Sequence, residues 1–182
     1  MSVTEKPATR TTEAVEPERV GRSPRLLTVV ALIAIIVGAG SVLGGIGGAA
    51  FTYQQAAVEN IITPGDAAIA EAPVRGPFTM WAQSDIITQH QLDRTDGLRY
   101  AEMDRMVPQI DEATGEVVLD ADGDPVMVEN LTRLSWIDAT SLTTVLNMGI
   151  MAYALSAFAM AVGATLLLLG VVVWRLRSAV LF

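Results

Sequence analysis

The stretch LLTVVALIAIIVGAGSVLGGIGGAAF, residues 26–51, contains no charged side chain and decides the class of this protein. A second stretch of the same kind, VLNMGIMAYALSAFAMAVGATLLLLGVVVW, covers residues 145–174. Each exceeds the roughly 20 apolar residues that an α-helix needs to cross a bilayer. The sequence therefore predicts a mainly α-helical membrane protein with two transmembrane helices and a small helical module between them, which carries a short β-hairpin.

The predicted organisation follows from these two stretches. Residues 1–24 are rich in Thr, Glu, Pro and Arg, a composition typical of a disordered tail. The predicted segments are then a first transmembrane helix at 25–54, the module at 55–140, a second transmembrane helix at 141–175 and a short tail at 176–182. We expect the first helix to remain as an anchor, because its apolar run exceeds the about 7–15 apolar residues of a signal peptide.

The positions of the arginines predict the orientation. Arg22 and Arg25 lie at the start of the first span, and Arg175 and Arg177 follow the second, whereas the first arginine of the module is Arg75. Since Lys and Arg close to the span ends mark the cytoplasmic side, both termini should be cytoplasmic and the module extracytoplasmic. Of the 20 acidic residues, 16 lie between the spans. Such an acidic module is not expected to bind nucleic acid.

The absence of certain residue types excludes several classes of protein and of binding site. The chain has no cysteine, which excludes a lipoprotein anchor, a disulfide-stapled module and thiolate metal sites. Neither apolar stretch contains an Asp, Glu, Lys, Arg or His residue, whereas pumps and proton-coupled transporters normally need one within the membrane. We therefore predict neither an autonomous transporter nor any cofactor or metal.

The first span has a regular pattern of small residues. Gly40, Gly44 and Gly48 recur every four residues and so share one face of the helix. Small side chains at this spacing let two helices approach closely in lipid, which predicts a helix-packing face. The second span of the same chain is the expected partner, and a homo-oligomer or a helix of another membrane protein is the alternative. Glycine is also common in membrane helices without such a role.

Turn residues divide the module into short elements. Gly76-Pro77 predicts a helix over 78–92 that ends at Asp96-Gly97. A second short helix is expected over 99–106, before Pro108, and a β-hairpin over about 115–129, with its turn at Gly123. Residues 131–142 should lead into the second span as helix.

The helix at 78–92 carries three candidate functional side chains, Trp81, Asp85 and His90. His90 is the only histidine, and Asp93 and Arg94 are neighbours to which it could bond. A lone histidine can act as a pH switch, although a packed or boundary role is more common. A metal centre that needs two or three histidines is excluded within one chain.

The acidic turn of the hairpin invites comparison with a calcium loop. Asp120, Asp122 and Asp124 alternate as calcium ligands do, with Gly123 among them. However, Pro125 follows at once, and no glutamate stands at the distance that such a loop requires. A hairpin turn explains the same residues without a cation.

Two segments of the module carry a resemblance to a known family. The first is GPFTMWAQSDIITQH, residues 76–90, and the second is GLRYAEM, residues 97–103. With the flanking spans, they resemble small two-span membrane proteins of actinobacteria. The likeness extends from the first span to the C-terminus, and residues 107–130 look like an insertion.

Many proteins of that family are labelled aromatic ring-opening dioxygenases. Extradiol ring opening needs ferrous iron on two histidines and a carboxylate, which one histidine cannot supply. The resemblance thus implies a two-span architecture and no activity that particular residues here could carry.

Three functions remain open from the sequence. The leading prediction is a non-enzymatic structural or accessory subunit of a cell-membrane complex, with membrane lipids and other membrane helices as partners. The second is an extracytoplasmic sensor of a ligand or cation. The third is an enzyme that would use carboxylates such as Asp85, Glu102 and Asp104.

Overall fold

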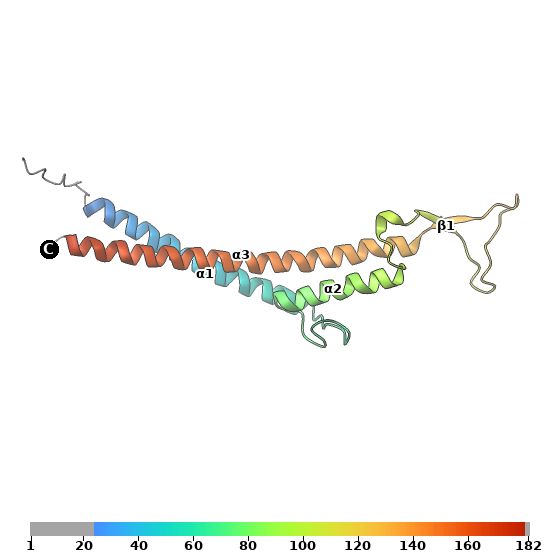
Figure 1. The fold of residues 1–182 in the computed structure, drawn as a ribbon, viewed down its shortest axis with the longest axis horizontal. Helices are drawn as coiled ribbons and strands as arrows, with labels where there is room; N and C mark the ends of the chain where they lie inside the picture. Colours follow the sequence, from blue (N-terminus) through green and yellow to red (C-terminus); the bar gives the residue numbers. More distant parts are fainter. Residues whose placement is uncertain (1–23, 181–182) are drawn as a thin grey trace, which may run out of the picture.

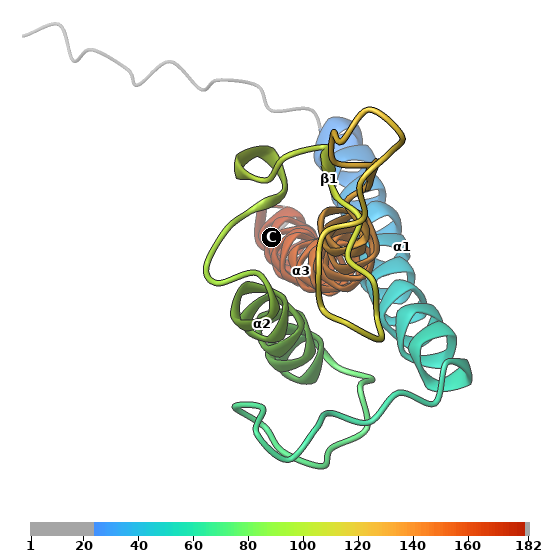
Figure 2. The same ribbon diagram turned by 90° about the vertical axis from the view of Figure 1, so that its right-hand side faces the viewer.

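The protein is a long rod built around one continuous helix (Figure 1). The computed structural model describes residues 24–180, so the predicted tail at 1–24 and the last two residues lie outside the described part, except for Pro24. The elements are α1 (Pro24–Val58), α2 (Pro77–Arg94), the 3-10 turn η1 (Tyr100–Glu102), β1 (Met106–Pro108), β2 (Met127–Glu129) and α3 (Leu131–Val180). The helices α1 and α2 lie on different sides of α3 (Figure 2).

The helix α3 joins the predicted second span to the module without a break. It contains 50 residues, which at 1.5 Å per residue gives a length of about 75 Å. Asn130 caps its start, because the Asn130 Oδ1 accepts a hydrogen bond from the backbone N–H of Arg133 at 3.0 Å. The expectation that residues 131–142 are helical is therefore confirmed. The first helix, predicted over 25–54, is α1, which extends four residues further and ends at Val58.

Both long helices are apolar enough to cross a membrane. Within their most apolar windows, only 11% of α1 and 17% of α3 is buried inside the chain. The core helix of a soluble protein would instead be mostly covered by its own chain.

Small residues at intervals of seven hold α1 and α3 together. Ala31, Gly38 and Gly45 on α1 are buried against α3, where Ser156, Gly163 and Gly170 repeat at the same interval. A Cβ placed on Gly38 would lie 2.8 Å from the backbone oxygen of Gly163, and one on Gly45 would lie 2.6 Å from that of Ser156. The two backbones are thus in direct contact, which only glycine permits at these positions.

The sequence predicted that Gly40, Gly44 and Gly48 contact the second apolar stretch, and this prediction is wrong for two of the three. Gly48 of α1 faces α3, since a Cβ on it would lie 2.8 Å from the Ser156 hydroxyl. A Cβ on Gly40 or on Gly44 would have no atom within 4 Å. A step of four residues rotates around an α-helix by about 40°, whereas a step of seven rotates by only about 20°. The seven-residue series therefore stays on the contact face, and the four-residue series turns away from it.

The helix α2 packs along α3, with its first turns beside Gly149 in the apolar stretch and Gln91 beside Ser135 in the part before it. Its start matches the prediction from Gly76-Pro77, and the Thr79 hydroxyl accepts the backbone N–H of Gly76 at 3.2 Å. Ala82 and Ile86 are buried on α2, whereas His90, for which a packed or boundary position is the more common one, is exposed. The helix ends as predicted before Gly97, whose φ of 82° is the left-handed conformation that glycine favours.

The hairpin is longer than the sequence suggested, and we call residues 103–130 the arm. Its ladder pairs β1 with β2 in antiparallel register, from Met106 opposite Glu129 to Pro108 opposite Met127. The helix expected over 99–106 is shorter than predicted. Only η1 is helical, and Met106, the last residue of the predicted helix, is the first residue of β1. Within the predicted hairpin at 115–129, the turn at Gly123 is present, with the bridge between Leu119 and Pro125 beside it.

Candidate functional site

The three candidate side chains of α2 are not brought together. Trp81 is exposed, and Asp85 is half-buried and accepts a hydrogen bond from the Gln89 amide at 2.6 Å. His90 faces a different segment, the loop that joins α1 to α2. The helix therefore presents separate surface groups rather than one catalytic cluster.

His90 binds an aspartate that the sequence did not suggest. Its Nε2 lies 2.6 Å from Oδ2 of Asp66, so the expected bonds to Asp93 or Arg94 are wrong. This hydrogen bond lowers the pKa of the Asp66 carboxyl below its usual value. The partner is 24 residues away in the chain, and helical spacing cannot reveal a contact of that range.

Asp66 belongs to a loop that folds on itself between α1 and α2. Thr63 donates its backbone N–H to the Ala72 oxygen at 3.0 Å, and Val74 donates to Ile61 at 2.9 Å. Thr63 is buried and its hydroxyl also accepts the Ala72 N–H at 2.9 Å. The loop is thus an ordered unit, which the contact between His90 and Asp66 ties to α2.

A polar groove of about 260 Å³ runs between α2 and α3. At its wall, the Gln91 amide donates to the Ser135 hydroxyl at 2.6 Å, which fixes the two helices side by side. Its lining combines both charges with apolar side chains: Ile87, His90, Gln91, Arg94, Ser135, Asp138, Ala139 and Leu142. The groove could take a small polar ligand, but His90, Arg94 and Asp138 in its lining are exposed to solvent.

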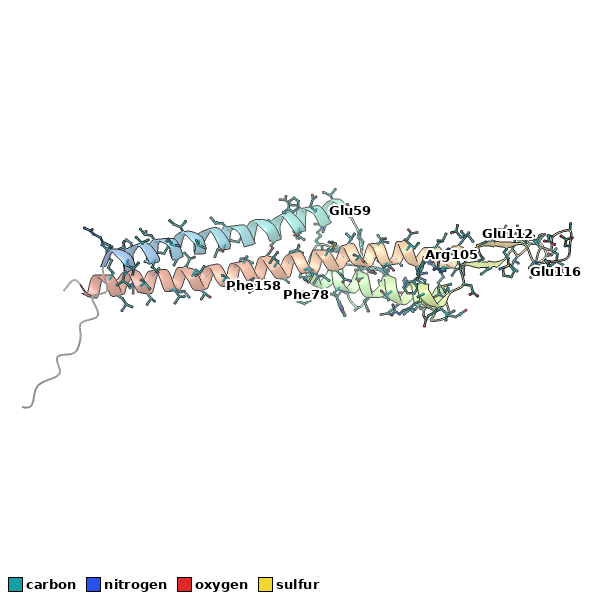
Figure 3. The ribbon with its side chains drawn as sticks, turned by 90° about the horizontal axis from the view of Figure 1, so that it is seen from above. Glu59, Phe78, Arg105, Glu112, Glu116 and Phe158 are labelled. Atoms are coloured by element: carbon teal, nitrogen blue, oxygen red, sulfur yellow. The ribbon has the colours of Figure 1, made fainter. Side chains whose placement is uncertain are left out.

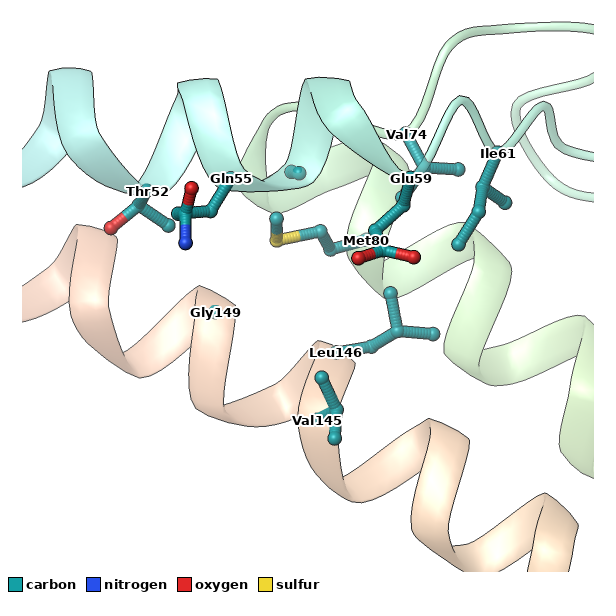
Figure 4. Close-up of a pocket in the computed structure, with 10 residues that line it drawn as sticks. Thr52, Gln55, Glu59, Ile61, Val74, Met80, Val145, Leu146 and Gly149 are labelled. Atoms are coloured by element: carbon teal, nitrogen blue, oxygen red, sulfur yellow. The ribbon is translucent and has the colours of Figure 1, made fainter.

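A second cavity, of about 220 Å³, lies where α1 and α3 diverge (Figure 4). Met80 of α2 reaches between the two helices, and its sulfur lies 2.7 Å from where a Cβ of Gly149 would be. The lining is mostly apolar, with Glu59 as its one charged residue: Thr52, Gln55, Ala56, Glu59, Ile61, Val74, Met80, Val145, Leu146 and Gly149. This cavity marks the junction of the three helices.

Of the three aspartates at the turn of the arm, Asp120 bonds to the backbone of that turn. The Asp120 carboxylate accepts the N–H groups of Asp122 and Asp124, both at 2.9 Å. This is the side-chain pattern of a turn. Among residues 24–180, no group of three or more His, Asp or Glu side chains is arranged to hold a metal ion.

The carboxylates considered for an enzyme do not converge on a cavity. Asp85 is half-buried, while Glu102 and Asp104 are exposed. Glu102 accepts the backbone N–H of Arg99 at 2.7 Å and so caps η1. None of the three lines either cavity described above.

Comparisons with protein-family models, with curated proteins and with solved structures found no match. The resemblance to two-span actinobacterial membrane proteins is not tested by them and stays a prediction.

Proposed function

We propose that this protein is a non-enzymatic structural or accessory subunit of a cell-membrane complex. The observation that carries the proposal is the continuity of α3, whose 50 residues run from the apolar segment into the module. Since α2 and η1 both pack on the same helix, the module has no hinge against its membrane anchor. The chain is built to hold a surface at a fixed distance from the bilayer.

The membrane location has two supports. The apolar windows of α1 and α3 are nearly uncovered by the chain, and lipid is the cover that such surfaces need. Arg25 lies at the same end of the helix pair as Arg175 and Arg177, because α1 and α3 run antiparallel (Figure 1). An arginine cluster at one end favours cytoplasmic termini and an extracytoplasmic module.

The non-enzymatic assignment rests on the dispersal of reactive groups. The one histidine is bonded to Asp66. Among the candidate carboxylates, Asp85 bonds to Gln89, Glu102 caps η1 and Asp104 is exposed. A ring-opening dioxygenase is not proposed, because its iron needs a second histidine. An extracytoplasmic ligand sensor is the alternative that the groove between α2 and α3 favours, with His90, Arg94 and Asp138 among its lining residues.

The outward face of α1 supports a helical partner. Gly40, Gly44 and Gly47 have open space where side chains would be, on the side of α1 away from α3. In a membrane, where packing drives helix association, such a face accepts another helix at short range. A partner helix there would belong to a second copy or to another subunit of the complex.

Mild solubilisation and purification of a C-terminally tagged copy test the proposal. We expect a membrane subunit to co-purify with the wild-type chain in constant stoichiometry. The Gly44→Leu variant should not retain this subunit, because the leucine side chain fills the open face of α1. Ala50→Leu is the control, because it places the same leucine side chain at an exposed position about a third of a turn from Gly44. Recovery of the wild-type chain alone, as a monomer or a homo-oligomer, would contradict the accessory role.

A further inference from the structure

Exposed aromatic side chains gather around the rod at the level where α2 begins. Phe78 is 76% exposed and Trp81 is 52% exposed, on the first turns of α2. Tyr53 of α1 is also exposed, and the Arg75 guanidinium lies 6.0 Å from the centre of its ring. Together with Tyr153 of α3, these residues form a group from three elements, which we call the outer belt.

Two contacts hold this group at a defined position along α3. The Tyr153 hydroxyl donates a hydrogen bond to the backbone oxygen of Arg75. Met80 packs on Gly149, one helical turn away. The first turns of α2 therefore lie beside residues 149–153, which belong to the second apolar stretch. Figure 3 shows Phe78 at the end of α2 that points toward the apolar half of the rod.

A matching aromatic and arginine pair lies at the other end of the apolar stretch. Trp174 is 41% exposed. The Arg177 guanidinium lies 5.4 Å from the centre of its ring. The helical rise from Tyr153 to Trp174 is about 32 Å, close to the roughly 30 Å thickness of a bilayer's hydrocarbon core. The two groups are thus spaced as the aromatic residues at the two surfaces of one membrane are.

We propose that the first turns of α2, Pro77–Trp81, are an interfacial anchor that inserts Phe78 and Trp81 into the outer headgroup layer of the bilayer. This inference rests on the membrane location proposed above and adds a third membrane contact to the two spans. The second span then shortens from 145–174 to about 153–174, which still meets the roughly 20 residues required.

The anchor fixes how the module leaves the membrane. Aromatic rings have an apolar body and prefer the boundary between hydrocarbon and water. The loop from Glu59 returns the chain to that boundary, and α2 then rises from it along α3 (Figure 1). With three contact points at the surface instead of two crossings alone, the tilt of the rod is set.

Fluorine NMR of the full chain labelled with 5-fluorotryptophan tests this inference in lipid nanodiscs. The protein has three tryptophans, at 81, 136 and 174, and single Trp→Phe variants assign the three signals. Broadening is then measured with a phospholipid that carries a spin label on its headgroup, and separately with a water-soluble paramagnet. Trp136, which donates its indole N–H to Leu98 within the module, is the internal control.

We expect the lipid label to broaden the Trp81 and Trp174 signals and to leave that of Trp136 sharp. If the lipid label broadens Trp174 alone and the water-soluble agent broadens Trp81, the anchor is refuted while the membrane location stands. If Trp174 also escapes the lipid label, the membrane location itself is wrong, and the anchor falls with it.

Discussion

At the scale of single residues, a contact between two helices depends on which glycines face the neighbour. Gly44 and Gly45 are adjacent in the chain, yet a Cβ on Gly44 meets open space and one on Gly45 meets the Ser156 backbone and Met160. The sequence signal for the true contact was present, since Gly163 and Gly170 repeat the seven-residue interval of Gly38 and Gly45. The four-residue series was the more visible pattern, but it drifts around the helix.

The pair Gly45→Ala and Gly44→Ala tests this assignment. Gly45→Ala should lower the free energy of unfolding in nanodiscs by about 1–3 kcal/mol, the usual cost of overpacking a closed interface. Gly44→Ala should cause no loss, because its new methyl group meets nothing within 4 Å. Denaturant titration of helix separation measures both. Equal losses from the two variants would show that the helices pair through another face.

At the scale of elements, local patterns predicted the helices well and the arm poorly. Caps and turn residues such as Pro77, Gly97 and Asn130 act within a few positions, so the ends of α2 and the start of α3 could be read from the sequence. The ladder between β1 and β2 joins segments about 20 residues apart, and its register depends on the intervening chain. The contact of Asp66 with His90 was missed for the same reason.

The docking of the loop on α2 should depend on pH. The pKa of Asp66 lies below its ordinary value of 3.8 because of the hydrogen bond with His90. A carboxyl whose pKa is lowered by folding contributes stability above its ordinary pKa, and that contribution is lost as the pH falls through the lowered value. The loop should therefore loosen in acid, below about pH 4.

Amide exchange at Thr63, Ala72 and Val74 measures this loosening, because their N–H groups bond within the loop. We expect Asp66→Asn to reduce protection at neutral pH and to remove its acid dependence. Asp93→Asn, an exposed neighbour of His90 in sequence, should change neither. An unchanged pH profile in Asp66→Asn would show that another group controls the loop.

At the scale of the whole molecule, the two apolar stretches predicted the architecture, and the structure adds its rigidity. The sequence indicated a mainly helical protein with two helices long enough to cross a membrane, and both features are present. It also indicated that residues 131–142 lead into the second apolar stretch as helix. It could not show that the two segments join without a bend, because helical periodicity does not reveal the angle at a junction. The proposed role as a rigid support depends on that continuity.

The distance between two spin labels, one on each half of α3, most directly tests whether α3 is one rigid helix. Because the chain has no cysteine, Ile137→Cys and Leu168→Cys place spin labels at two exposed positions without a background. In lipid nanodiscs, we expect a single narrow distance distribution near 46 Å, about 1.5 Å for each intervening residue. Ser141→Pro should broaden it by breaking the helix, whereas Ser141→Ala should not. A broad distribution in the parent double-cysteine protein would show that the module moves freely on its anchor and would contradict the proposed role.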